Sequence, residues 1–191
     1  MITQLTIKKA AIWALTAALF ALHLLTRSVA HAAESPLEQW KQVTTSTCRI
    51  SFPSIPQLVQ QRLPLAGTNQ TLTYDIYIAP FNEKNLCLFL IATYPMALPA
   101  GQEEAGLKGL IRGIVGHSPS NKLLYANMID HKGYPAVDFQ VESPTSIFRG
   151  QALIVGNKLY LIAVEGHLDG FNESAFSAFL KSFLLLKSVS Q

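Results

Sequence analysis

Alternating apolar and polar positions run through much of the chain and predict β-strands. The period of two is clearest where Val137, Phe139 and Val141 alternate with polar side chains, because successive residues of a strand point to opposite faces of a sheet. The same pattern, or a short apolar run bounded by turn residues, predicts further strands at residues 48–52, 58–63, 72–78, 86–92, 123–129, 147–155 and 158–164. Residues 86–92 are apolar throughout, which is typical of a central strand covered on both faces.

Helical spacing of apolar side chains replaces the alternation in two places. One stripe predicts a helix over residues 102–115 and consists of Leu107, Leu110, Ile111, Ile114 and Val115. The other follows Asn172, a residue type that caps helix N-termini, and consists of Phe176, Phe179, Leu180 and Phe183. A short helix ending near residue 43 is also predicted, because Ser35 suits the cap and Pro36 suits the first helical position.

The order of these elements predicts the fold class. It reads helix, four strands, helix, four strands, helix, and the short connections favour antiparallel pairing. Pro80 predicts the end of the strand at residues 72–78, and Gly156-Asn157 predicts a two-residue hairpin. The outer strands have one polar face, whereas the strand at residues 86–92 is apolar on both faces. This combination indicates that helices cover both faces of the sheet. We therefore predict an α+β domain with an antiparallel β-sheet sandwiched by helices.

The N-terminal residues have the pattern of a secretory signal peptide. Lys8 and Lys9 precede an apolar run at residues 10–25, and the small-x-small site Ala30-His31-Ala32 follows. This predicts a signal peptide at residues 1–32, cleaved after Ala32. The run is shorter than the roughly 20 apolar residues that cross a bilayer, so an uncleaved membrane anchor is the alternative. An N-terminal helical segment (33–46) and one domain (47–191) would follow, exported to the periplasm or secreted.

Charge argues against a nucleic-acid partner. The formal net charge of +3 comes from the predicted signal peptide, which holds three of the 15 basic residues and no acidic one. The other 12 basic residues balance the 12 acidic residues of the chain and are scattered singly along it. Nucleic-acid binding needs clustered Lys and Arg. Contact with a membrane is expected only if the N-terminal segment stays uncleaved.

Two cysteines, Cys48 and Cys87, permit one disulfide in an exported chain. Both fall in predicted strands, so they are either bridged or two small buried core residues. A reactive catalytic thiol is the least favoured interpretation, because no His or Asn constellation points to either cysteine.

Few polar patterns suggest chemistry. His167 and Asp169 lie in a loop between two glycines, which suggests either a weak metal or acid–base site or a connector between a hairpin and a helix. Asp130 and His131 are adjacent, so on one strand their side chains should point to opposite faces. Nucleophile-elbow, Walker A, dinucleotide-binding, zinc-protease and calcium-loop motifs are all missing from the sequence. We accordingly predict no catalytic residue, no cofactor and no metal.

Several motifs together resemble the PsbP/Mog-like family. They are Ile50-Ser51-Phe52-Pro53-Ser54-Ile55-Pro56, Lys132-Gly133-Tyr134-Pro135-Ala136-Val137-Asp138-Phe139, Phe148-Arg149-Gly150, Gly156-Asn157-Lys158-Leu159-Tyr160-Leu161 and Ala178-Phe179-Leu180-Lys181-Ser182-Phe183. The resemblance covers residues 47–186 and implies an antiparallel sheet sandwiched by helices. It also implies a non-enzymatic accessory role, since family members act as extrinsic photosystem II subunits or as a partner of a small GTPase. Many exported bacterial relatives have no assigned role, and unlike lipid-anchored ones this chain lacks a cysteine after its signal.

These observations predict an exported, non-enzymatic accessory or protein-binding domain of the cell envelope, with an envelope protein as its partner. A small-ligand or metal-binding module that uses a sheet face or the His167 loop is the alternative. A hydrolase of unrecognised type is a weaker one, because active sites are spatial constellations that need no sequence motif.

Overall fold

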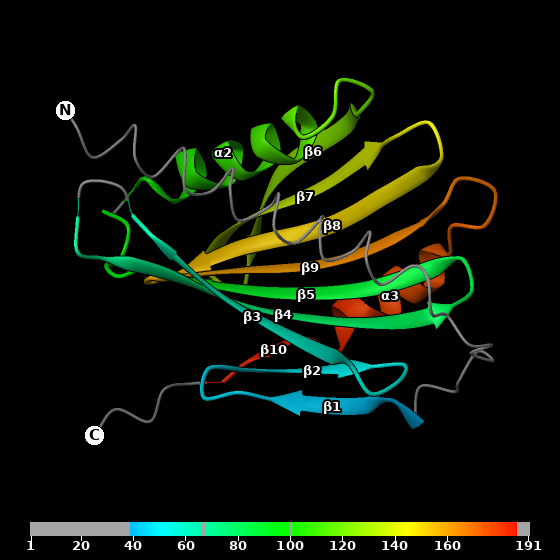
Figure 1. Cartoon of the computed structure of the whole chain (residues 1–191), viewed down its shortest axis with the longest axis horizontal. Coiled ribbons are helices and arrows are strands. Elements are labelled where there is room, and N and C mark those ends of the chain that lie inside the picture. Colours follow the sequence, from blue (N-terminus) through cyan, green and yellow to red (C-terminus); the bar gives the residue numbers. More distant parts are fainter. Residues whose placement is uncertain (1–38, 66–67, 100, 187–191) are drawn as a thin grey trace.

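A computed structural model describes residues 39–65, 68–99 and 101–186, which form two antiparallel sheets and two helices (Figure 1). The larger sheet has seven strands in the order β3-β4-β5-β9-β8-β7-β6, and the smaller has the order β1-β2-β10. The strands are β1 (Lys41–Thr44), β2 (Cys48–Phe52), β3 (Gln57–Pro64), β4 (Thr71–Asn82), β5 (Asn85–Thr93), β6 (Lys122–His131), β7 (Tyr134–Glu142), β8 (Ser146–Val155), β9 (Lys158–His167) and β10 (Leu184–Leu185). The helices are α2 (Glu103–Gly116) and α3 (Glu173–Lys181).

Short hairpins order the large sheet as the sequence predicted. Gly156 has a φ of +60° in the turn between β8 and β9, where glycine meets no steric cost. The Asn157 side chain donates to the Tyr94 carbonyl at 2.8 Å, which ties this turn to the end of β5. The prediction that Pro80 ends its strand is wrong. Pro80 still pairs with Leu86, and a register shift after it lets β4 continue to Asn82.

Two apolar clusters occupy opposite faces of the large sheet. The strand β5 contributes to both, because Leu88 and Leu90 join one cluster while Phe89 and Ile91 join the other. The prediction of a central strand covered on both faces is therefore confirmed. The first cluster includes the buried stripe of α2, and the second includes the inward side of β2 and of α3.

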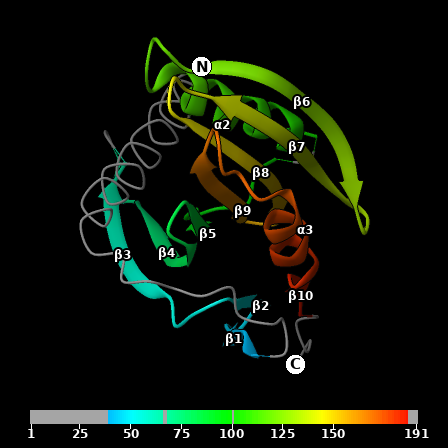
Figure 2. The ribbon, with the colours of Figure 1, turned by 90° about the vertical axis from the view of Figure 1, so that its right-hand side faces the viewer.

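The predicted sandwich of helices is wrong. On one face, α2 packs against β6, β7 and β8 at one end of the curved sheet (Figure 2). On the other face, the nine-residue α3 shares the surface with the β1-β2-β10 sheet, so strands provide much of that layer. The order of predicted helices and strands gave a wrong arrangement because β2 does not belong to the main sheet. It pairs with β1 and β10 instead.

The described part of the predicted N-terminal helix is also a strand. Lys41–Thr44 pairs with β2 in a register that places Val43 opposite Ile50. The backbone groups of this segment form hydrogen bonds within the sheet. The Trp40 ring packs edge-on against the Phe81 ring, with 6.2 Å between the ring centroids. The helix signal at Ser35 and Pro36 lies outside the described residues. So do the predicted signal peptide and its cleavage site at Ala30 and Ala32, and these stay predictions together with the domain boundaries.

Local cap and helix predictions agree with the structure. Asn172 caps α3, with its side chain accepting a hydrogen bond from the Ala175 amide at 2.9 Å. The helix predicted at residues 102–115 is α2. Neither helix in the described ranges has both the length and the hydropathy needed to cross a bilayer.

Candidate protein-binding surface

Exposed apolar side chains gather on the hairpin formed by β6 and β7. Among the described residues, nine large hydrophobic side chains are exposed, and five of them belong to this hairpin: Leu123, Leu124, Met128, Ile129 and Tyr134. Leu124 is the most exposed of the five at 49%. Single exposed apolar residues are ordinary, but five on one two-stranded hairpin concentrate apolar surface at this end of the sheet, on both of its faces.

The position of β6 explains this exposure. It is the last strand of the seven-stranded sheet and, among the described residues, pairs only with β7. The hairpin closes through Lys132 and Gly133, both at positive φ, as a two-residue turn requires. The Asp130 carboxylate accepts from the Gly133 amide at 2.9 Å and braces that turn.

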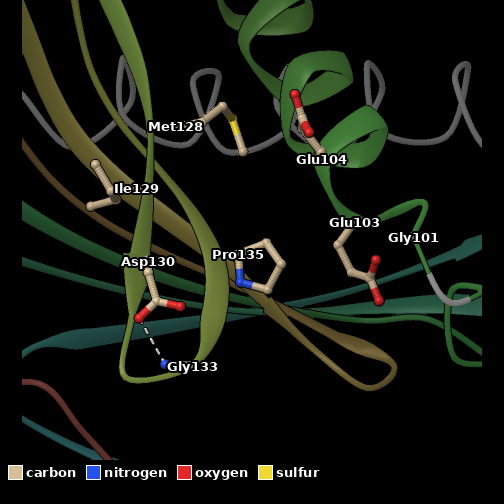
Figure 3. Close-up of a pocket in the computed structure, with 8 residues that line it drawn as sticks. All are labelled: Gly101, Glu103, Glu104, Met128, Ile129, Asp130, Gly133 and Pro135. Atoms are coloured by element: carbon tan, nitrogen blue, oxygen red, sulfur yellow. Dashed lines mark hydrogen bonds between the residues drawn. The ribbon is translucent and has the colours of Figure 1, made fainter.

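A groove of about 520 Å³ lies between the hairpin and the start of α2 (Figure 3). It is lined by Gly101, Glu103, Glu104, Met128, Ile129, Asp130, Gly133 and Pro135. Met128 and Pro135 point toward α2, and Ile129 points away from it (Figure 3). The lining includes three carboxylates and no basic side chain. Glu104 is paired with Lys108 at 2.6 Å one helical turn later.

A half-buried arginine fixes the hairpin from the opposite face. The Arg149 guanidinium on β8 forms a two-pronged ion pair with Asp138 on β7. Its Cζ lies 4.5 Å from the centroid of the Phe176 ring on α3 and 5.1 Å from that of Tyr125 on β6. Glu173 lies 3.7 Å from its Nε. The arginine thus joins β6, β7 and β8 to α3, a role that the sequence pattern did not reveal.

His131 and Asp130 point to opposite faces, as predicted. Asp130 lines the groove, whereas the His131 ring packs against Phe183 and its Nδ1 lies 2.8 Å from the Gln151 amide nitrogen. That amide nitrogen donates, so the proton of the neutral imidazole sits on Nε2, which is buried without a hydrogen-bond partner among the described residues. Burial, assisted by Lys132, lowers the His131 pKa.

His167 and Asp169 do come together, at the opposite end of the sheet. Their Nδ1 and Oδ1 atoms are 3.0 Å apart, and Lys84 lies 3.3 Å from the other carboxylate oxygen. All three side chains are exposed. The hydrogen bond and charge of Lys84 are the main reason that the Asp169 pKa is lowered. Within the described ranges, no three His, Cys, Asp or Glu side chains are grouped so that they could hold a metal ion.

Buried hydrogen bonds hold this loop in place. The Asn85 side chain, 1% exposed, donates to the Gly170 carbonyl at 2.8 Å and to Asn82 Oδ1 at 2.9 Å. Its own oxygen accepts from the Asn172 amide at 3.1 Å. The loop that carries His167 is therefore built as a connector between β9 and α3.

Of the two alternatives left open for the cysteines, the disulfide is not formed. Cys48 on β2 and Cys87 on β5 are free thiols, and both are completely buried in the cluster beneath α3. Cys48 Sγ lies 3.2 Å from the Thr45 hydroxyl. Burial raises the pKa of both thiols, so neither has the character of an activated nucleophile. The alternative of two small buried core residues describes the structure.

Comparison with solved structures gives a match at the level of the fold. The solution structure of cyanobacterial PsbP (CyanoP) from Synechocystis sp. PCC 6803 aligns with a TM-score of 0.52 and 10% sequence identity, over 85% of this chain and 99% of that chain. No protein-family model matches the sequence, and no curated protein does. The chain therefore has a PsbP-like fold. At this identity the likeness carries the fold alone.

Proposed function

We propose that this protein is a non-enzymatic accessory domain of the cell envelope that binds a protein partner through the β6–β7 hairpin. One observation carries the proposal, namely the concentration of exposed apolar side chains on that hairpin. Such a group leaves apolar surface in water, where each square ångström that a partner covers contributes roughly 25 cal/mol before the costs of association.

The rigidity of the hairpin supports this proposal. The contacts of Arg149 to Asp138, Tyr125 and Phe176 hold the β6–β7 ribbon in one position from its inner face. A surface that is already fixed loses little conformational entropy when a partner binds. The exported location rests on the signal-peptide pattern of residues 1–32, and the non-enzymatic role rests on the missing catalytic motifs and on the family resemblance.

Photo-crosslinking in cells that make the protein tests the surface. A benzoylphenylalanine in place of Leu124 or Met128 would crosslink a partner that contacts the β6–β7 hairpin. The same residue in place of Leu58, which is 44% exposed on the opposite edge strand β3, is the matched control. We expect one heterologous product of the same mass from both hairpin positions and none from Leu58. Equal yields from all three positions would contradict the assignment to the hairpin.

Fractionation and intact-mass measurement test the compartment. We expect a protein in the envelope fraction whose sequence begins at Ala33. Full-length protein in the membrane fraction would make residues 10–25 an anchor, and full-length protein in the cytosol would contradict export.

A further inference from the structure

The two edges of the large sheet differ in composition. The strand β3 carries three glutamines and Arg62 and ends in Pro64, which are features that discourage pairing with another strand. The ten-residue β6 contains no proline, and its exposed positions include Leu123, Leu124, Met128 and Ile129. A long, exposed and apolar edge with unpaired backbone groups is a template for an additional strand. Of the two edges, β6 is therefore the one suited to strand addition.

A bulge sets the part of β6 that can accept such a strand. The pairing register with β7 shifts between Leu123 and Tyr125, so this end of β6 is locally irregular. From Tyr125 onward the register is continuous to the turn. Residues 125–129 thus offer about 17 Å of regular edge, at roughly 3.4 Å per residue.

The groove defines the charge of the incoming segment. Among the described residues, neither Glu103 nor Asp130 has a cationic partner; Asp130 accepts a hydrogen bond from the Gly133 amide and Glu104 is paired with Lys108. The groove begins where the regular edge of β6 ends. A lysine or arginine at that end of an added strand would meet two uncompensated carboxylates.

We infer that the partner adds an extended segment to β6 along residues 125–129, with an apolar side chain beside Met128 and a basic side chain in the acidic groove. This inference rests on the proposed function and names the binding mode and the chemistry of the partner. Backbone hydrogen bonds along residues 125–129 give the affinity, and the groove gives the selectivity.

A second copy of the chain fits this site poorly. In an antiparallel β6–β6 pair the basic residue that approaches the groove is Lys122. Lys122 is opposite Glu142 in the β6–β7 ladder, and Asp130 is opposite Pro135. Glu142 and Pro135 are an odd number of residues apart on β7, so their side chains face opposite sides of the sheet. Residues directly opposite each other on paired strands point to the same side, so Lys122 and Asp130 also face opposite sides. The partner copy's lysine would therefore point away from the groove.

Designed peptides test the inference on the full chain. The probe is an eight-residue peptide of alternating valine and threonine with two lysines at one end. The first control ends in two glutamates, and the second carries N-methyl groups on alternate amides, which remove backbone donors and keep the side chains. We expect the lysine peptide to slow hydrogen exchange at every second amide of residues 125–129, since outward-facing amides alternate. We expect affinity at least about fivefold weaker for each control.

Variants of the groove separate charge from shape. Asp130→Asn keeps an oxygen that can accept from Gly133, so combined with Glu103→Gln it removes charge without removing the turn contact. Glu142→Gln, which removes a carboxylate of β7 outside the groove lining, is the control for loss of a negative charge elsewhere on the hairpin. We expect the double variant to weaken the lysine peptide about tenfold at low salt, with the difference largely lost at about 0.5 M salt, and the control to leave binding unchanged.

Several results would overturn the inference. Strand addition is excluded if the N-methylated peptide binds as tightly as the lysine peptide, or if binding slows hydrogen exchange at none of the β6 amides. Equal affinity for the lysine and glutamate peptides excludes the groove as a cation site. A crosslinked product of twice the chain mass would identify a second copy as the occupant. If heterologous crosslinks form at the hairpin while the peptides fail, the proposed function stands and this binding mode does not.

Discussion

Removal of the Asn85 side chain should destabilise the fold by a definable amount. Asn85→Ala eliminates three hydrogen bonds, two donated by Nδ2 and one accepted by Oδ1. Asn82 Oδ1 keeps the Lys84 amide as a donor at 2.9 Å. The carbonyl of Gly170 and the amide of Asn172 lose the Asn85 side chain as a partner in a partly buried place.

The magnitude follows from these two backbone groups. A polar group that loses its hydrogen-bond partner away from water costs about 1–3 kcal/mol. Because these two groups are only partly buried, we expect a loss of roughly 2–4 kcal/mol in the free energy of unfolding. Asn85→Asp keeps the acceptor for the Asn172 amide but turns an oxygen toward Asn82 Oδ1 and the Gly170 carbonyl. A protonated carboxyl relieves that repulsion, so the pKa of the introduced acid should be raised in the folded state. Its stability deficit should therefore be smaller at acidic pH than at neutral pH.

Urea unfolding followed by circular dichroism measures both variants. With a slope of about 2 kcal/mol per molar urea, the midpoint for Asn85→Ala should fall by about 1–2 M with the slope unchanged. Asn127→Ala is the control, because Asn127 is exposed on β6 and its midpoint should stay within experimental error. A loss below about 1 kcal/mol for Asn85→Ala would refute the argument that its hydrogen bonds hold the β9–α3 loop.

Three further predictions concern packing, thiols and pH. A Cβ at Gly150 would lie 2.6 Å from Phe139 Cζ, so Gly150→Ala should lower the free energy of unfolding by about 1–3 kcal/mol. Gly116→Ala, which meets nothing within 4 Å, should be neutral or stabilising in the same urea assay. Cys48 and Cys87 should react with a thiol reagent only after unfolding, and reaction of either thiol in native buffer at the rate of a free peptide cysteine would contradict their burial. Because burial lowers the His131 pKa, its neutral form is favoured in the folded state, so the unfolded chain binds more protons as the pH falls through about 6.5. Stability should therefore decline below that pH, and His131→Gln should reduce the decline when unfolding is measured from pH 8 to 5.

Patterns that depend on neighbouring residues were readable from the sequence. The alternation in β7, the Asn172 cap of α3 and the Gly156 hairpin turn each arise from a few adjacent residues. The antiparallel sheet followed from the short connections between them. The N-terminal helix failed because Lys41–Thr44 forms its hydrogen bonds with β2, a partner that local propensity does not reveal.

The helix sandwich was predicted wrongly and the candidate surface on β6 was not predicted at all, and the two outcomes have a related cause. The apolar residues of β6 look like those of a core strand, and their exposure follows from the place of β6 at the end of the sheet order. The disulfide was one of two open alternatives and rested on the even number of cysteines. A cysteine count carries no information on distance, and Cys48 on β2 and Cys87 on β5 are buried free thiols. Strand order and inter-sheet packing decide all three outcomes, and neither is encoded in a local pattern.

The polar contacts of Arg149 explain how the hairpin can combine exposure with order. An edge hairpin with few apolar contacts would be free to twist or fray. The guanidinium instead links Asp138 on β7 to Phe176 on α3, and it covers the Tyr125 ring of β6. Because this anchoring uses the α3 side of the ribbon, no described residue pairs with the outer backbone edge of β6 or fills the groove beside α2. The same cluster that stabilises the hairpin therefore leaves the proposed binding edge accessible.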